Sequence, residues 1–250
     1  RKQIERFWNT VTELGNSTGE GSDIDIWLIS RLQYHIRRTT EALDNFQTRQ
    51  ALQESFYAIE SDLKWYRRRI SGASEGSRQL QELCSVWVRL LAPIIPFTCE
   101  YLWKNLHKGG LVSFADWPVA NSELVKPDLE LAEELLARTV EDIESILKII
   151  QIEPASISIY CAPAWKQEIF SMVAGAPDKN LVIREIMKND AMKKRGKEAT
   201  DATRQCTTLI HRLPPQLVDQ ITASAIDEKS IFENACSFLQ KEFGVPVKVL

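Results

Sequence analysis

The sequence predicts a mainly α protein, with an antiparallel helical bundle over residues 1–125 followed by a small α+β domain over residues 126–250. At residues 46–69, apolar side chains recur at alternating steps of four and three residues, and no Gly or Pro intervenes. This spacing is the pattern of an amphipathic helix with one buried stripe. Further segments of this kind are joined by short polar breaks, which is typical of an antiparallel bundle. Beyond residue 125, helical patterns alternate with two strand-like segments.

The first half of the chain is predicted to form helices at residues 2–14, 23–45, 46–70, 80–91 and 97–106. Stretches rich in Gly and Ser separate the first helix from the second, at residues 15–22, and the third from the fourth, at residues 71–77. Pro93 and Pro96 end the fourth helix, because proline lacks an N–H donor and disfavours helical backbone in the residue before it. Residues 111–125 are expected to be an extended segment that lies across the bundle and leads to the second domain.

The second half begins with a helical pattern at residues 127–153. Ile157, Ile159 and Cys161 then alternate with polar residues, which predicts a strand. Further along, the sequence predicts helices at residues 164–174 and 182–187, a polar loop at residues 188–204 around Gly196, a last helix from Asp227 to Gly244, and a terminal strand at residues 245–250. Two distant strands with helices between them indicate a small α+β domain.

Composition and motifs argue against several classes of site. The net charge is −3, so the whole chain carries no excess of positive charge for nucleic acid. The five cysteines are widely spaced and are expected to be small core residues in a reducing cytoplasm. The three histidines have no second ligand type at useful spacing, and no phosphate-binding loop or nucleophile elbow occurs. The sequence therefore predicts no catalytic site, no metal site and no membrane span, and the helical pattern at Arg1 indicates a piece of a longer protein.

Positive charge gathers at two places that the net charge hides. Arg67, Arg68 and Arg69 end the helix at residues 46–69, where they either solvate that end or contact phosphates. Residues 179–212 contain nine basic and four acidic residues, whereas residues 127–153 contain eight acidic and two basic ones. These two segments either pair with each other, or the basic one meets a phosphate backbone. Its candidate contacts cluster around Gly196: Lys188, Lys193, Lys194, Arg195 and Lys197.

The seven tryptophans admit two interpretations. Most lie on predicted core stripes, so packing in the protein interior is the expected role of each. Stacking on nucleic-acid bases is the alternative.

Several segments together resemble a known family. They are residues 27–32, residues 40–51 with the Phe-Gln-Thr-Arg turn at 46–49, residues 62–69 with the Trp-Tyr-Arg-Arg-Arg end, residues 87–97, residues 99–103 and the Trp-Pro pair at 117–118. This set resembles the anticodon-binding helical bundle of class I aminoacyl-tRNA synthetases. The turn at 46–49 and the arginine end look most like leucyl-tRNA synthetase of the archaeal and eukaryotic type. The match is strongest over residues 22–118, and the remainder is similar in size to that family's C-terminal extension.

The resemblance implies that the full protein joins leucine to its tRNA with ATP and Mg²⁺, in a catalytic domain that precedes Arg1. It implies that this chain binds no cofactor and acts as a cytoplasmic monomer. The bundle would rest against the tRNA body, and the C-terminal domain would hold the long variable arm of leucine tRNA. In relatives the chain end approaches that arm, so its backbone N–H and C=O groups would meet unpaired bases. The residues so implicated in tRNA binding are Arg67, Arg68, Arg69, Lys193, Lys194, Arg195, Lys197, Lys248 and Leu250.

Two other readings remain open from the sequence. Isoleucyl- and valyl-tRNA synthetases share the general pattern of the bundle, and binding to tRNAs with and without a long variable arm would separate them. A reading from another class is a protein-interaction scaffold, in which the acidic helix at residues 127–153 pairs with a protein partner.

Overall fold

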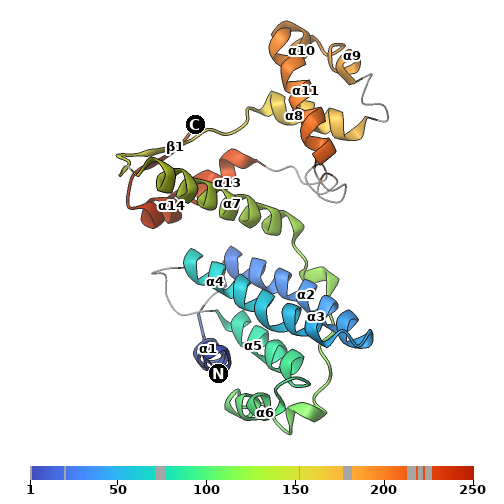
Figure 1. The fold of residues 1–250 in the computed structure, drawn as a ribbon, viewed down its shortest axis with the longest axis vertical. Helices are drawn as coiled ribbons and strands as arrows, with labels where there is room; N and C mark the ends of the chain where they lie inside the picture. Colours follow the sequence, from blue (N-terminus) through green and yellow to red (C-terminus); the bar gives the residue numbers. More distant parts are fainter. Residues whose placement is uncertain are drawn as a thin grey trace. The chain divides into compact units, whose positions relative to one another are not determined.

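The computed structural model describes residues 2–19, 21–70, 77–151, 153–176, 182–212, 218, 222 and 227–250. Contacts divide the chain into two compact units, residues 1–130 and 131–250. Each unit has its own hydrophobic core. The predicted fold class is confirmed: helices dominate both units, and one small parallel sheet lies in the second (Figure 1).

The first unit is a helical bundle. Its elements are α1 (Lys2–Leu14), α2 (Asp23–Asp44), α3 (Thr48–Leu52), the π-helix η1 (Gln53–Ala58), α4 (Ile59–Arg69), α5 (Arg78–Leu91), α6 (Pro96–Asn105) and the 3-10 turns η2 (Val112–Phe114) and η3 (Ser122–Leu124). The long helix α2 packs against α3, α4 and α5, and Figure 1 shows α2 and α4 side by side. Ser22 and Asp25 form a capping box at the start of α2, which satisfies N–H groups that have no partner within the helix.

The predicted helix at residues 46–70 is helical throughout, but it contains the π-helical segment η1, which the periodicity did not predict. The indole N–H of Trp87 on α5 donates to the Ser55 carbonyl of this segment at 2.7 Å, and the Ser55 hydroxyl donates to the Ala51 carbonyl at 2.7 Å. Trp87 and Ser55 are both buried, so the indole finds its required acceptor in the backbone of a neighbouring helix.

Polar residues inside the bundle join α2 to the helix of residues 48–69. His35 is 2% exposed, and its Nε2 lies 2.9 Å from Asp62. Arg31 donates to the same Asp62 carboxylate at 3.1 Å, and the Nδ1 of His35 lies 3.5 Å from Glu54. Closer to the start of α2, the Tyr66 hydroxyl donates to Asp25 at 2.8 Å. These buried polar contacts fix the register of the two helices, because a shift would leave charged groups without partners.

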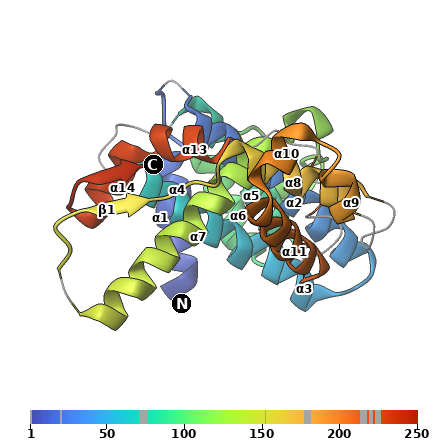
Figure 2. The same cartoon turned by 90° about the horizontal axis from the view of Figure 1, so that it is seen from above.

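The second unit begins inside α7 (Pro127–Ile150) and continues with β1 (Ile157–Ile159), α8 (Ala164–Gly175), α9 (Val182–Ile186), α10 (Asp190–Arg195), α11 (Lys197–Arg212), α13 (Glu228–Asn234), α14 (Cys236–Phe243) and β2 (Val247–Val249). The two strands pair in parallel, with Ile157 opposite Val247. Figures 1 and 2 both show α11 alongside α8, and their contact forms the core of this part.

Three expectations from the sequence need correction. Residues 188–204 are not a polar loop: apart from a short turn after α9 and the junction at Gly196, they belong to α10 and α11. The inward-facing residues of α11 are mainly small: Ala199, Ala202 and Cys206. They have helical spacing, but small side chains give a weak hydrophobic signal, so the segment was predicted to be a polar loop. The helix capped by Asp227 is two helices that meet at Ala235. Only Cys84 and Cys99 are buried, whereas Cys161, Cys206 and Cys236 are partly accessible.

Candidate nucleic-acid interface

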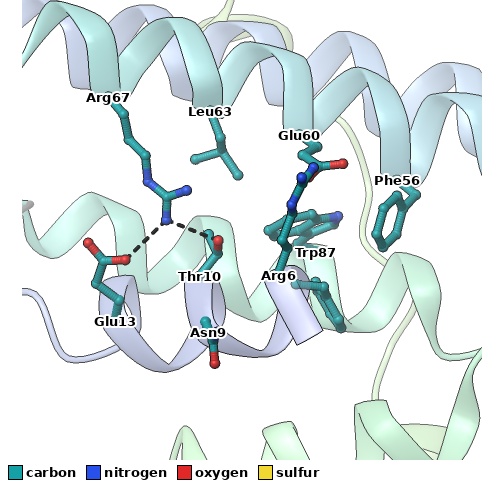
Figure 3. Close-up of a pocket in the computed structure, with 10 residues that line it drawn as sticks. Arg6, Asn9, Thr10, Glu13, Phe56, Glu60, Leu63, Arg67 and Trp87 are labelled. Carbon is teal, nitrogen blue, oxygen red and sulfur yellow. Dashed lines mark hydrogen bonds and ion pairs between the residues drawn. The ribbon is translucent and has the colours of Figure 1, made fainter. Parts of the chain in front are cut away.

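The three arginines at the end of α4 point to different sides of the helix, because consecutive helical residues are about 100° apart. Arg67 faces α1, where its guanidinium donates to the Thr10 hydroxyl at 3.0 Å and to the Glu13 carboxylate at 3.1 Å (Figure 3). Arg68 lies with its guanidinium carbon 6.0 Å from the centroid of the Trp65 ring, and Arg69 is half-buried. The three charges therefore do not form one patch, and Arg67 already has an acidic partner.

A cleft of about 230 Å³ lies between α1 and α4, and Figure 3 shows the side chains that line it. Arg67 pairs with Glu13 near one end, and Arg6 lies 3.4 Å from Glu60 on the same helix pair. Trp87, which is buried, lines the cleft. Each arginine is matched by a glutamate, so the cleft carries no excess of positive charge, and a phosphate would have to displace a carboxylate there.

A denser basic cluster lies in the second unit. Lys193, Lys194 and Arg195 form the exposed last turn of α10, and Lys197 begins α11 after Gly196. Gly196 has φ +53°, a backbone conformation that favours glycine, so this residue lets one helix end and the next begin within a single step.

The side chain of Arg195 lies over an aromatic ring of a neighbouring helix. Its guanidinium carbon is 4.5 Å from the centroid of the Trp165 ring on α8, and Lys166 Nζ is 5.7 Å from the same centroid. Arg195 also lies 4.0 Å from Glu198, a distance at the limit of an ion pair. Stacking on the half-buried indole restricts the orientation of the Arg195 guanidinium. We call Trp165, Lys166, Lys193, Lys194, Arg195 and Lys197 the Trp165 cluster.

Two members of this cluster were not predicted. Trp165 was assigned to the core like the other tryptophans, but it is half-buried and faces Arg195. Lys166 was not singled out, although it follows an aromatic residue at the start of a helix, which is a recognisable signal. Burial raises the pKa of the Cys206 thiol, and the positive charge of Lys166 opposes that rise, which places Lys166 close to α11. Lys188, by contrast, donates to Glu185 at 2.8 Å, and this bond lowers the pKa of that carboxyl.

The end of the chain corrects one sequence expectation. The N–H of Leu250 donates to the Ile159 carbonyl at 2.9 Å, and the Leu250 carbonyl accepts from the Cys161 N–H at 3.0 Å. The backbone groups of Leu250 that were expected to meet bases are therefore used by the sheet. A residue at the end of a chain is well ordered when its backbone N–H and C=O groups form hydrogen bonds with a neighbouring strand. The side chain of Lys248 is exposed.

Within the described residues, no three His, Cys, Asp or Glu side chains are grouped so that they could hold a metal ion. Among the helices that the structure describes, none has the length and apolar character needed to cross a membrane.

Comparison with known proteins adds to this geometry. Residues 25–159 match a family model described as the anticodon-binding domain of tRNA ligase. Over 99% of its length, the chain is 36% identical to a leucine–tRNA ligase of Pyrococcus furiosus. It is also 35% identical to the leucine–tRNA ligase of Methanothrix thermoacetophila and 32% identical to that of Methanosarcina mazei, in both cases over its whole length. The chain spans about a quarter of the length of these curated relatives.

Proposed function

This chain belongs to the family of anticodon-binding domains of tRNA ligases, and we propose that it is the tRNA-binding part of a leucine–tRNA ligase of the archaeal and eukaryotic type. The observation that carries the proposal is the similarity to archaeal leucine–tRNA ligases, which extends beyond the matched domain over the whole chain. If the chain shared only the helical bundle with these enzymes, its second unit would not need to resemble theirs.

The activity of the whole protein, in this proposal, is the ATP-dependent joining of leucine to its tRNA. ATP and Mg²⁺ act in a catalytic part that lies outside this chain, and the chain itself holds no cofactor. It works in the cytoplasm as a monomer and presents the tRNA to the catalytic part. Its contribution to catalysis is therefore to orient the substrate. Holding two reactants in the correct geometry lowers the activation barrier of the reaction between them.

The Trp165 cluster is the proposed contact with the long variable arm. Its lysines would neutralise phosphates, and Arg195 would donate hydrogen bonds to phosphate oxygens while Trp165 holds its guanidinium. In the bundle, Arg67, Arg68 and Arg69 are the proposed contacts with the tRNA body, and a phosphate at Arg67 would have to replace the Glu13 carboxylate. Lys248 remains a proposed contact through its exposed side chain, and Leu250 through its side chain alone.

The test is binding of the chain to a fluorescently labelled leucine tRNA transcript, followed by anisotropy over a range of salt concentrations. Reversal of charge at Lys193, Lys194 and Arg195 should weaken binding and make its salt slope shallower by about two to three units. A matched control reverses Lys104 and Lys108, which are exposed lysines near the end of α6. Unchanged affinity and salt slope in the triple variant would exclude the Trp165 cluster as a contact.

Specificity separates the proposal from its relatives. A leucine enzyme should prefer leucine tRNA to an isoleucine tRNA that lacks a long variable arm, and the preference should disappear when that arm is deleted. Equal binding of the two tRNAs would favour the isoleucyl or valyl alternative.

A protein-interaction scaffold is the second candidate, because one observation favours it. Ile146, Ile149 and Ile150 on the acidic helix α7 are 56%, 81% and 46% exposed. Exposed isoleucines grouped on one helix are typical of a protein contact. Indifference to every tRNA, together with capture of a defined protein partner that Ile149→Asp abolishes, would support this candidate.

A further inference from the structure

The turn between α2 and α3 places an aromatic residue in a costly backbone conformation. Helix α2 ends in a Schellman motif, in which Phe46 N–H donates to Leu43 at 2.9 Å and Gln47 N–H donates to Ala42 at 2.7 Å. The residue after the cap of this motif adopts left-handed backbone and is usually glycine. Here it is Phe46, with φ +57°. A bulky residue is sterically strained in this conformation.

Nothing in the described part of the protein compensates this strain through packing. Phe46 is 91% exposed, whereas two phenylalanines in the core of the bundle, Phe7 and Phe56, are only 1% and 5% exposed. A residue that costs stability in its backbone and gains none from burial is a candidate for a contact outside the chain.

The surroundings of Phe46 indicate what that contact is. Phe46 lines a shallow, open hollow of the surface together with Gln47, Thr48, Arg49, Gln50 and Gln53. Arg49 is exposed, and among the described residues its guanidinium forms no ion pair. The three glutamine amides can each donate and accept a hydrogen bond. An aromatic face, an unpaired positive charge and several amides are the groups that bind a base, a phosphate and a base edge respectively.

We propose that this turn, residues 46–53, binds an unpaired nucleotide of the tRNA. The base stacks on the ring of Phe46, the adjoining phosphate lies at Arg49, and a glutamine amide contacts the edge of the base. Base-paired nucleotides do not fit, because their faces are covered by their neighbours in the helix. The inference rests on the proposed function, since the nucleotide belongs to the tRNA that the chain holds.

The first test uses the full chain and a labelled leucine tRNA transcript, with the dissociation constant measured by anisotropy. Phe46→Ala should weaken binding about tenfold, which is the usual effect of losing one base–aromatic stack. Phe46→Trp should bind at least as well as the unchanged chain, and Phe46→Leu should behave like the alanine variant because it is apolar but has no aromatic face. Arg49→Gln should make the salt slope shallower by about one unit. The matched control is Phe97→Ala, because Phe97 is also 91% exposed and lies at the start of α6.

A glycine variant separates binding from folding. Phe46→Gly relieves the left-handed backbone, so its unfolding midpoint should rise by about 2 °C while its tRNA affinity falls with that of the alanine variant. If Phe46 had only a structural role, a substitution there would lower the tRNA affinity only when it also lowered the unfolding midpoint.

The outcomes distinguish this inference from the function on which it rests. If the unchanged chain binds leucine tRNA and Phe46→Ala and Arg49→Gln bind equally well, the turn does not hold a nucleotide, and the proposed function stands. An equal loss in Phe97→Ala would also overturn the inference, because any exposed aromatic residue would then have the same effect. If the unchanged chain binds no tRNA, both the inference and the proposed function fail.

Discussion

Replacing Tyr66 by Phe tests whether a single buried hydrogen bond joins two helices of the bundle. The Tyr66 side chain is 1% exposed, and its hydroxyl donates to one oxygen of Asp25 at 2.8 Å. The other oxygen of Asp25 accepts from the N–H and the hydroxyl of Ser22, at 2.7 and 2.6 Å. The Asp25 carboxylate therefore serves the cap of α2 and the contact with α4 at the same time.

The size of the effect follows from what the substitution removes. Phenylalanine keeps the ring and leaves no large cavity, so the loss is one hydrogen bond to a charged acceptor. Such a bond contributes about 1.5–3 kcal/mol. We expect Tyr66→Phe to lower the free energy of unfolding of the bundle by that amount. Urea unfolding followed by tryptophan fluorescence is a suitable assay, because every tryptophan except Trp165 lies in the first unit.

The dependence on pH gives a second, independent readout. Burial, the hydrogen bond to Asp25 and the negative charge of Asp25 all raise the pKa of Tyr66. An unfolded tyrosine ionises near pH 10, whereas the folded one stays protonated there. The unfolded state therefore binds fewer protons above pH 10, and stability falls as the pH rises. Since phenylalanine cannot ionise, the stability difference between the unchanged chain and Tyr66→Phe should shrink above pH 10.

Tyr57→Phe is the matched control, because Tyr57 is 42% exposed on the same helical run and should change stability by less than about 0.5 kcal/mol. Asp25→Ala completes a double-mutant cycle, in which the two substitutions should be strongly non-additive. The reasoning is refuted if Tyr66→Phe unfolds like the unchanged chain at pH 7 and shows the same loss of stability at alkaline pH.

Three further outcomes are expected from the same structure. Leu63→Ala should lower the free energy of unfolding of the bundle by about 2–5 kcal/mol in urea, because the side chain is 1% exposed; a smaller loss would mean that the core closes around the gap. Gly196→Ala should lower the stability of the second unit by about 1 kcal/mol in thermal unfolding, because Gly196 has φ +53°. The added Cβ would cause no clash, since no described atom lies within 4 Å of it. An unchanged midpoint would show that the backbone at this junction can relax. Cys84 and Cys99 should resist a thiol reagent at pH 8, because burial raises the pKa of each to about 12, while the partly accessible cysteines react; rapid labelling of all five thiols would contradict the packing.

Periodicity was sufficient to place most of the bundle. Helix α2 was predicted within a residue at each end, because Ser22 and Asn45 flank a long apolar stripe with the right spacing. The same reasoning failed at residues 188–204, where the buried positions of α10 and α11 include small residues such as Ala199 and Ala202. Small side chains carry a weak hydrophobic signal, although they allow close packing against α8. The π-helical segment was not predicted either. The carbonyl of Ser55 in this segment accepts a hydrogen bond from the Trp87 indole on another helix, a contact that no local pattern specifies.

The candidate interface was predicted in composition but not in geometry. The sequence identified the basic run at residues 193–197, and the structure places that run at the surface. The role of Trp165 depends on the approach of α10 to α8, which no local pattern specifies. The pairing of Arg67 with Glu13 likewise joins residues from two helices that are distant in sequence. The strain at Phe46 has a local cause, but only the folded structure shows that its side chain is exposed.

The sequence by itself determined the class of the fold, the position of most helices and the family, because these depend on spacing and residue type along the chain. The tertiary structure decided what each charged side chain contacts: Arg195 lies over the ring of Trp165, whereas Arg67 pairs with Glu13. The physical reason is that the interaction energy of a charged side chain depends on its distance from other charges and on its burial. Both quantities are set by helices that meet only when the chain has folded.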